Sequence, residues 1–186
     1  MNYHNNMIFI FNKVVAMGTI VMQIVLLYLL AYYFVNRKDA NDVVLNWLQK
    51  FGIRISLFIA FFGAILTLVY SEVVGYPACY LCWIQRGFMY PQIIFLAVAV
   101  WMRKRWAIIV SLVLSVLGML VAIYHNWVSL IGDSEKCTAF GNTTSCATRY
   151  VYEFGYITIP VMSLTIFLLL TLLLSISLTK RATISE

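Results

Sequence analysis

Five long apolar stretches divide this chain of 186 residues and constrain its fold more than any other feature. Each holds close to the roughly 20 residues that a helix needs to cross about 30 Å of hydrocarbon. Lipid offers no partner to a bare backbone N–H or C=O, and the stretches are too long and continuous for barrel strands. We therefore expect transmembrane helices over residues 14–35, 55–70, 83–102, 107–124 and 157–178.

The composition excludes a soluble domain, because 63% of the residues are hydrophobic, only 11% are charged and the mean hydropathy is +0.90. The first stretch is too long for a signal-peptide core and has no small-residue cleavage site after it, so we expect it to be retained. The sequence thus predicts an all-α membrane protein.

The net charge of +6 does not indicate nucleic-acid binding, because the cations cluster beside the ends of the expected helices. Nine of the 13 basic residues fall on one side if the chain alternates across the membrane, and an excess of Lys and Arg marks the cytoplasmic side. These residues are Arg37, Lys38, Lys50, Arg54, Arg103, Lys104, Arg105, Lys180 and Arg181.

All four cysteines fall at or near the opposite, outer face, in the segment 71–82 and in the loop 125–156. Outside the cytosol, thiols meet oxidising conditions, so paired cysteines there are expected to form disulfides or to take part in disulfide exchange.

Cys79 and Cys82 form a C-x-x-C pair at the outer end of the third expected helix. Arg86 follows Cys82 by four residues, so in a helix the two share one face about one turn apart. A nearby cation or helix N-terminus favours the thiolate, which is the nucleophile of disulfide exchange. The competing interpretation of Arg86 is snorkelling toward the outer headgroups.

The second pair, Cys137 and Cys146, brackets eight residues of the outer loop. A static disulfide that pins the loop is one interpretation, and exchange with the first pair is the other. The spacing does not fit a structural zinc site, so no metal is predicted.

A thiol relay at the edge of a bilayer has a lipid-soluble quinone as its nearest two-electron acceptor. Arg86 is a candidate to stabilise a developing quinone oxyanion. His125, at the outer end of the fourth expected helix, is a candidate to donate a hydrogen bond or a proton there, although a lone interfacial histidine is more often a solvated or capping residue.

Two segments carry a resemblance to a known family. The run Cys-Tyr-Leu-Cys-Trp-Ile-Gln-Arg at residues 79–86 resembles the C-x-L-C-x-x-Q/E-R signature of the DsbB disulfide-bond formation proteins. The run Phe-Gly-Tyr-Ile-Thr-Ile-Pro at residues 154–160 resembles the segment that opens the last helix in the BdbC-like branch of that family. The similarity covers about residues 55–178.

The resemblance implies a four-helix transmembrane bundle with a quinone, ubiquinone or menaquinone, beside the first cysteine pair. It also implies a thioredoxin-like partner of the DsbA or BdbD type, whose thiolate attacks Cys137. Cys146 would then attack Cys79, and the freed Cys82 would pass electrons to the quinone, whose headgroup Arg86 and His125 would bind.

The chain departs from the family pattern at its N-terminus. We expect residues 1–50 to form an additional transmembrane helix and a cytoplasmic loop, and residues 51–186 to form the DsbB-like bundle. The cysteine loop would lie outside the bacterial cytoplasmic membrane and the C-terminus inside it. The competing function is a non-catalytic membrane scaffold whose disulfides only hold the outer loops in place.

Overall fold

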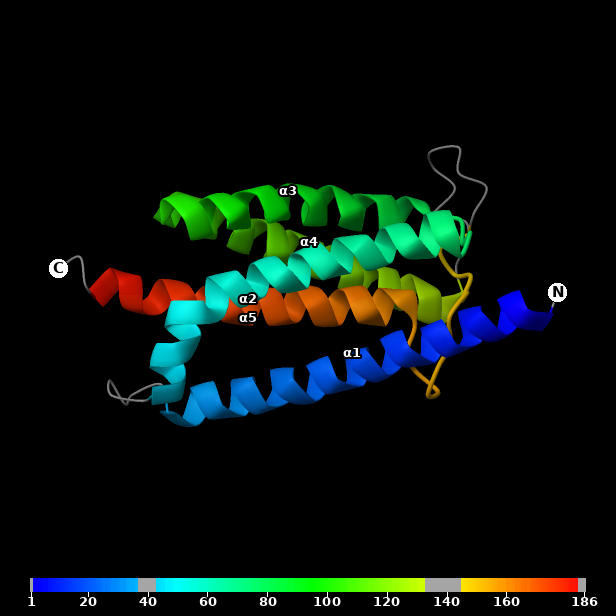
Figure 1. Cartoon of the computed structure of the whole chain (residues 1–186), viewed down its shortest axis with the longest axis horizontal. Helices are drawn as coiled ribbons and strands as arrows, with labels where there is room; N and C mark the ends of the chain where they lie inside the picture. The colour runs from blue at the N-terminus through cyan, green and yellow to red at the C-terminus, as the bar shows by residue number, and fades with distance from the viewer. Residues whose placement is uncertain (1, 37–42, 133–144, 184–186) are drawn as a thin grey trace.

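A computed structural model describes residues 2–36, 43–132 and 145–183. Within these residues, every secondary-structure element longer than an isolated bridge is a helix. The helices lie side by side along the long axis of the molecule (Figure 1). In chain order they are α1 (Asn2–Asn36), α2 (Val43–Leu68), the π-helical turn η1 (Val69–Val73), α3 (Tyr80–Met102), α4 (Arg105–Ile131) and α5 (Ile159–Thr183). The predicted all-α fold with an additional N-terminal helix is confirmed.

Four helical segments in the described part of the chain are long and apolar enough to cross a membrane: 6–36, 43–73, 105–131 and 159–179. Helix α3 is not among them, although it runs beside the others for most of their length (Figure 1). Its polar residues Gln85, Arg86 and Gln92 lower its hydropathy, and all three are buried in the bundle. We therefore treat α3 as a fifth span whose polar side chains avoid lipid.

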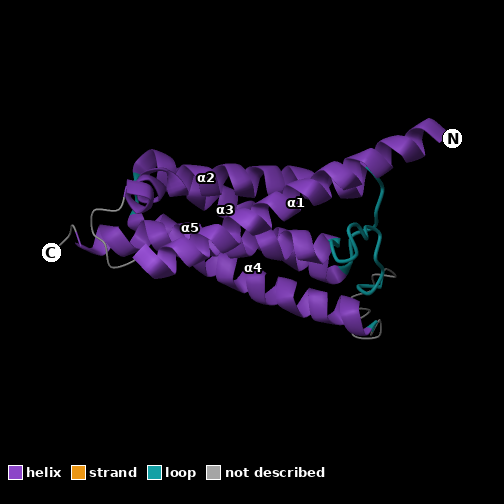
Figure 2. Ribbon diagram, turned by 90° about the horizontal axis from the view of Figure 1, so that it is seen from below, coloured by secondary structure: helices purple, strands orange, loops and turns teal. Residues whose placement is uncertain are grey.

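The connection between α3 and α4 is short and cationic. Arg103 ends α3 in the left-handed region with a φ of 53°, and extended Lys104 precedes α4. The two helices therefore run antiparallel, which separates this connection from Cys79 by the length of α3. Figure 2 shows the loop around 145–158 at the end of the bundle nearest the N-terminus, with the end of α5 at the opposite end.

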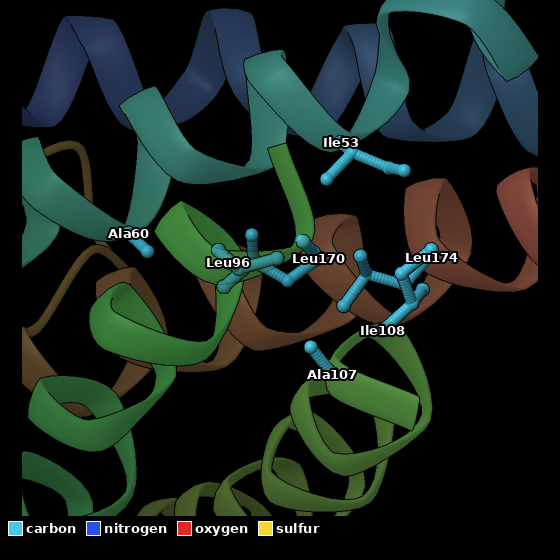
Figure 3. Packing of buried hydrophobic residues seen from close by; sticks show 8 residues of the cluster. Ile53, Ala60, Leu96, Ala107, Ile108, Leu170 and Leu174 are labelled. Carbon is cyan, nitrogen blue, oxygen red and sulfur yellow. The ribbon is translucent and has the colours of Figure 1, made fainter. Parts of the chain in front are cut away.

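The main hydrophobic core joins α2, α3, α4 and α5 (Figure 3). None of its buried members comes from α1. The core therefore holds the four C-terminal helices together as a bundle. Its buried residues are Ile53, Ala60, Leu96, Ala99, Ala107, Ile108, Leu170 and Leu174.

Helix α1 packs against the outside of this bundle, mainly along α5. Leu26 of α1 joins an apolar cluster with Leu48 of α2 and Leu173 of α5. Nearer the loop at residues 145–158, Ala16 is fully buried in a second cluster with Tyr70 and Ile157. Two apolar contacts along its length thus fix α1 to the bundle.

Gly118 allows α4 and α5 to approach each other closely. A Cβ atom built at this position would overlap the ring of Phe167, which is itself fully buried. Lipid supplies no hydrophobic force between helices, so such close packing by small residues is an important source of association.

We predict that Gly118→Ala destabilises the bundle by about 1–3 kcal/mol, because the added methyl group must displace the Phe167 ring. Thermal unfolding of the purified protein in detergent measures the change. Gly87→Ala on α3 is the matched control, since no atom lies within 4 Å of its added Cβ. Equal stability of the two variants would contradict this packing.

Candidate active site

Cys79 and Cys82 begin α3 and are both free thiols. Cys79 is the N-cap residue in an extended conformation, and its carbonyl accepts the first helical hydrogen bond from the Trp83 amide at 3.2 Å. The Cys82 side chain, one turn later, returns to the same face, so that the two Sγ atoms lie 3.0 Å apart. Cys79 is 5% exposed, so water has little access to its sulfur.

His125 of α4 lies against Cys79. Its Nε2 is 3.6 Å from Cys79 Sγ, and its Nδ1 is 3.1 Å from the amide nitrogen of Gln85. With the Gln85 amide donating to Nδ1, the proton of the neutral ring resides on Nε2 and points at the sulfur. Gln85 thus orients His125 as a hydrogen-bond donor to Cys79.

These contacts favour the thiolate at Cys79. The hydrogen bond from the Cys82 thiol is the main cause that lowers the pKa of Cys79, from an ordinary value of 9.0 to about 4, against the opposing effect of burial. The hydrogen bond from His125 lowers this pKa further. The sequence analysis considered a favoured thiolate at Cys82 beside Arg86, whereas the structure provides the hydrogen bonds at Cys79.

Cys146 lies over the first pair, although 67 positions separate it from Cys79 in the chain. The ligand-type atoms of Cys79, His125 and Cys146 all lie within 4.8 Å of one another. The cluster could geometrically accept a metal, but Cys146 is disulfide-bonded and in that state offers no thiolate ligand. The arrangement therefore brings a thiol and a disulfide sulfur close enough for exchange.

The segment that follows Cys146 holds this sulfur in place. The Arg149 guanidinium donates to the Ser129 carbonyl at the end of α4 at 2.8 Å, and Val151 is buried against the bundle. Cys146 itself is 2% exposed and packs with Leu81 and Val128. Cys137, the other predicted loop cysteine, lies outside the described residues.

Arg86 is buried one turn beyond Cys82. Its guanidinium donates to the Thr67 carbonyl at 2.8 Å and lies over the ring of Trp83, 5.2 Å from the ring centroid. Thr67 precedes the turn η1, where the hydrogen-bond pattern of α2 changes, and π-helical turns are frequent at functional sites. The charge is therefore satisfied inside the bundle and does not snorkel to the headgroups.

A cavity of about 420 Å³ connects these groups. At one end Cys79, Cys82 and Cys146 line it with His125, and Arg86 and Gln85 lie beside them. Farther along α3 its lining becomes apolar. The apolar lining includes Met22, Gly63, Met89, Met162 and Ile166.

Five of the six predicted site residues lie in the described chain, and this one cavity brings them together. The sequence analysis gave Gln85 no role and did not foresee that α1 and Tyr70 would line the cavity. The buried Tyr70 hydroxyl has no hydrogen-bond partner in the part of the chain that the structure describes. The sequence signal for Gln85 was its place at the Q/E position of the C-x-L-C-x-x-Q/E-R signature, one residue before Arg86.

Comparison with known proteins decides the family. Residues 49–177 match the model of the family described as "Disulfide bond formation protein DsbB". The chain belongs to the DsbB family. Membership makes it a multi-pass membrane protein with an oxidoreductase role in disulfide formation, and the matched range leaves α1 outside.

Named relatives agree with this membership of the DsbB family. The SPbeta prophage-derived disulfide bond formation protein B of Bacillus subtilis is 36% identical over 61% of this chain and 76% of its own length. A probable disulfide formation protein C 2 of Bacillus anthracis is 31% identical over 72% and 95%. A probable disulfide formation protein of Oceanobacillus iheyensis is 33% identical over 74% and 88%. No solved structure is significantly similar.

We predict that alkylation of Cys79 in the reduced protein continues as the pH falls and is lost only near pH 4, because the thiolate persists above its lowered pKa. The measurement is the alkylation rate of each cysteine against pH by mass spectrometry. His125→Ala should move the midpoint for Cys79 upward, since it removes one stabilising donor. A midpoint near 9 in the unaltered protein would contradict the assignment.

Proposed function

We propose that this DsbB-family protein is a thiol:quinone oxidoreductase that reoxidises a thioredoxin-like dithiol protein outside the cytoplasmic membrane. One observation carries the proposal: a free thiol pair and a disulfide sulfur meet at the reactive end of an otherwise apolar cavity. A scaffold whose disulfides only pin loops does not require this proximity or a buried cation.

A series of thiol–disulfide exchange steps accounts for the placement of the sulfurs. The partner's thiolate attacks Cys137, forms a mixed disulfide and releases Cys146 as a thiolate. Cys146 attacks Cys79 of the oxidised first pair, and the S–S bond between Cys79 and Cys82 breaks to release Cys82. The partner's second thiolate attacks the mixed disulfide, closes the partner's own disulfide and releases Cys137. Cys137 then attacks Cys146, re-forms the loop disulfide and releases Cys79, so two electrons and two protons pass from the partner to the Cys79–Cys82 pair.

The direction of transfer is favoured by the surroundings of Cys79. A hydrogen-bonded Cys79 thiolate stabilises the reduced form of the first pair, which favours electron transfer onto that pair. In the proposed cycle, electrons reach the first pair when Cys79 and Cys82 are thiols and Cys146 is again in its disulfide. Regenerating the enzyme then requires an acceptor beside Cys82.

The residues around the cavity fit a quinone. Its apolar lining suits a lipid-soluble ring, and the Arg86 guanidinium is a donor for a developing oxyanion. The buried Tyr70 hydroxyl adds an unpartnered donor to the same lining. A quinone held there, ubiquinone or menaquinone, supplies the acceptor for the two electrons and two protons that the dithiol releases when Cys79 and Cys82 form a disulfide again.

The charge pattern supports the orientation. The cationic turn at Arg103 and Lys104 lies at the far end of α3 from Cys79. If these cations are cytoplasmic, as the excess of Lys and Arg favours, the cysteines face the outside. The same rule favours a cytoplasmic C-terminus. A DsbA- or BdbD-type partner would then meet Cys137 outside the membrane.

Trapping tests the entry point. In the Cys146→Ser variant, Cys137 has lost its loop partner and is a free thiol. It should therefore attack a disulfide on the active-site cysteine of a thioredoxin-like protein and form a mixed disulfide with that protein. With a partner whose second active-site cysteine is replaced by serine and whose remaining cysteine carries an activated disulfide, the adduct should persist. Non-reducing electrophoresis and mass spectrometry detect it. An equally abundant adduct in a variant lacking both Cys137 and Cys146 would exclude Cys137 as the entry point.

Turnover measurements test the transfer of electrons from Cys79 and Cys82 to the quinone. We expect anaerobic addition of quinone to remove the free thiols of Cys79 and Cys82 in the reduced protein, and Cys79→Ser or Cys82→Ser to abolish quinone reduction with the reduced partner. Thiol labelling and quinone absorbance measure the two effects. Gly87→Ala, on the exposed side of α3, should retain the rate of the unaltered protein. Normal turnover in either serine variant would refute the relay.

A further inference from the structure

Helix α1 contributes one face to the cavity. Val15, Gly18, Thr19 and Met22 all line it, and their spacing of three and four residues places them on one side of the helix. Thr19 is buried, and its hydroxyl donates to the Val15 carbonyl at 2.9 Å, so it brings no unpaired polar group to the lining. The family match begins at residue 49, so this face is an addition to the matched bundle.

Contacts on both sides of this stretch hold α1 against the cavity. Gln23 donates to the Thr165 hydroxyl of α5 at 3.2 Å and accepts from the Tyr156 hydroxyl at 2.7 Å. On the N-terminal side, the ring centroids of Phe11 and Tyr70 lie 5.4 Å apart. A paired amide in an apolar helix favours one register against its neighbour. The cavity face of α1 is therefore fixed relative to α5 and to the turn η1.

Gly18 leaves an opening in this face. It lines the cavity and is nevertheless exposed, and no atom lies within 4 Å of where its Cβ would be. Ala16 and Thr19, close to it in the helix, are buried. The cavity thus reaches the lipid-facing surface locally at Gly18, in the apolar part of the lining that includes Met22 and Gly63.

We propose that α1 is a wall of the acceptor cavity and that the opening at Gly18 is the lateral port through which the isoprenoid tail of a membrane quinone passes into lipid. The proposal rests on the proposed function. The polar end at Cys82 and Arg86 suits the headgroup, and an apolar tail must leave toward hydrocarbon without crossing the outer loops. Under this proposal, the residue at position 18 affects the affinity for the tail of the quinone and not the affinity for its headgroup.

Gly18→Phe tests the port, because an aromatic side chain would occupy the open space. Two quinones with one headgroup serve as probes, one with a short alkyl substituent and one with a long isoprenoid tail. We expect KM for the long-tailed quinone to rise roughly tenfold, with KM for the short one changed less than about twofold. Ala31→Phe, on an exposed position of α1 outside the cavity lining, should change neither value.

Photolabelling gives a second readout that does not depend on turnover. A quinone carrying a photoreactive group on its first isoprene unit should label the α1 peptide around Gly18 and Met22, and Gly18→Phe should reduce that label. Gly18→Leu provides a smaller block if the phenylalanine variant unfolds. Label confined to α2–α5, or equal changes in KM for both quinones, would overturn the port. Failure of the unaltered protein to reduce either quinone would instead reject the proposed function.

Discussion

Lipid cannot solvate a guanidinium or an amide, and the position of α3 in the bundle follows from this constraint. Arg86 and Gln92 would be costly on a lipid-facing surface, and both are buried. Arg86 finds the Thr67 carbonyl, and Gln92 finds the Ser111 carbonyl and the Ser115 hydroxyl on α4. Pairing the Arg86 guanidinium and the Gln92 amide N–H groups requires the polar face of α3 to lie inward, against α2 and α4.

The same orientation assembles the reactive centre. Once α3 turns this face inward, its first turns bring Cys79, Cys82 and Gln85 into the bundle beside His125 of α4. The segment that follows α4 adds Cys146 beside them, and the burial of Cys79 and Cys146 limits the access of water to their sulfurs. In such a setting, hydrogen bonds to a thiolate are stronger than in water, so a few donors suffice to shift its pKa.

Much of the fold was predictable because hydropathy records what a helix meets in lipid. The apolar stretches located all five helices, and the charge pattern matched the observed separation of the cationic turn at Arg103 from Cys79. Helix ends were less predictable, since α4 continues to Ile131 and buries His125 within it, beyond the expected end at residue 124. Polar residues such as His125 lower the local hydropathy even where the helix continues, so hydropathy alone places the end of α4 too early.

The amino-acid sequence by itself determined the helical architecture, the C-x-x-C pair and the proximity of Arg86 to that pair. These features depend on local spacing and on the free-energy cost of polar groups in hydrocarbon. Only the tertiary structure decided that Cys79 is the stabilised thiolate, that Cys146 lies beside it and that α1 completes a cavity. These depend on contacts between segments far apart in the chain. No periodicity along one helix specifies which face of another helix it will meet.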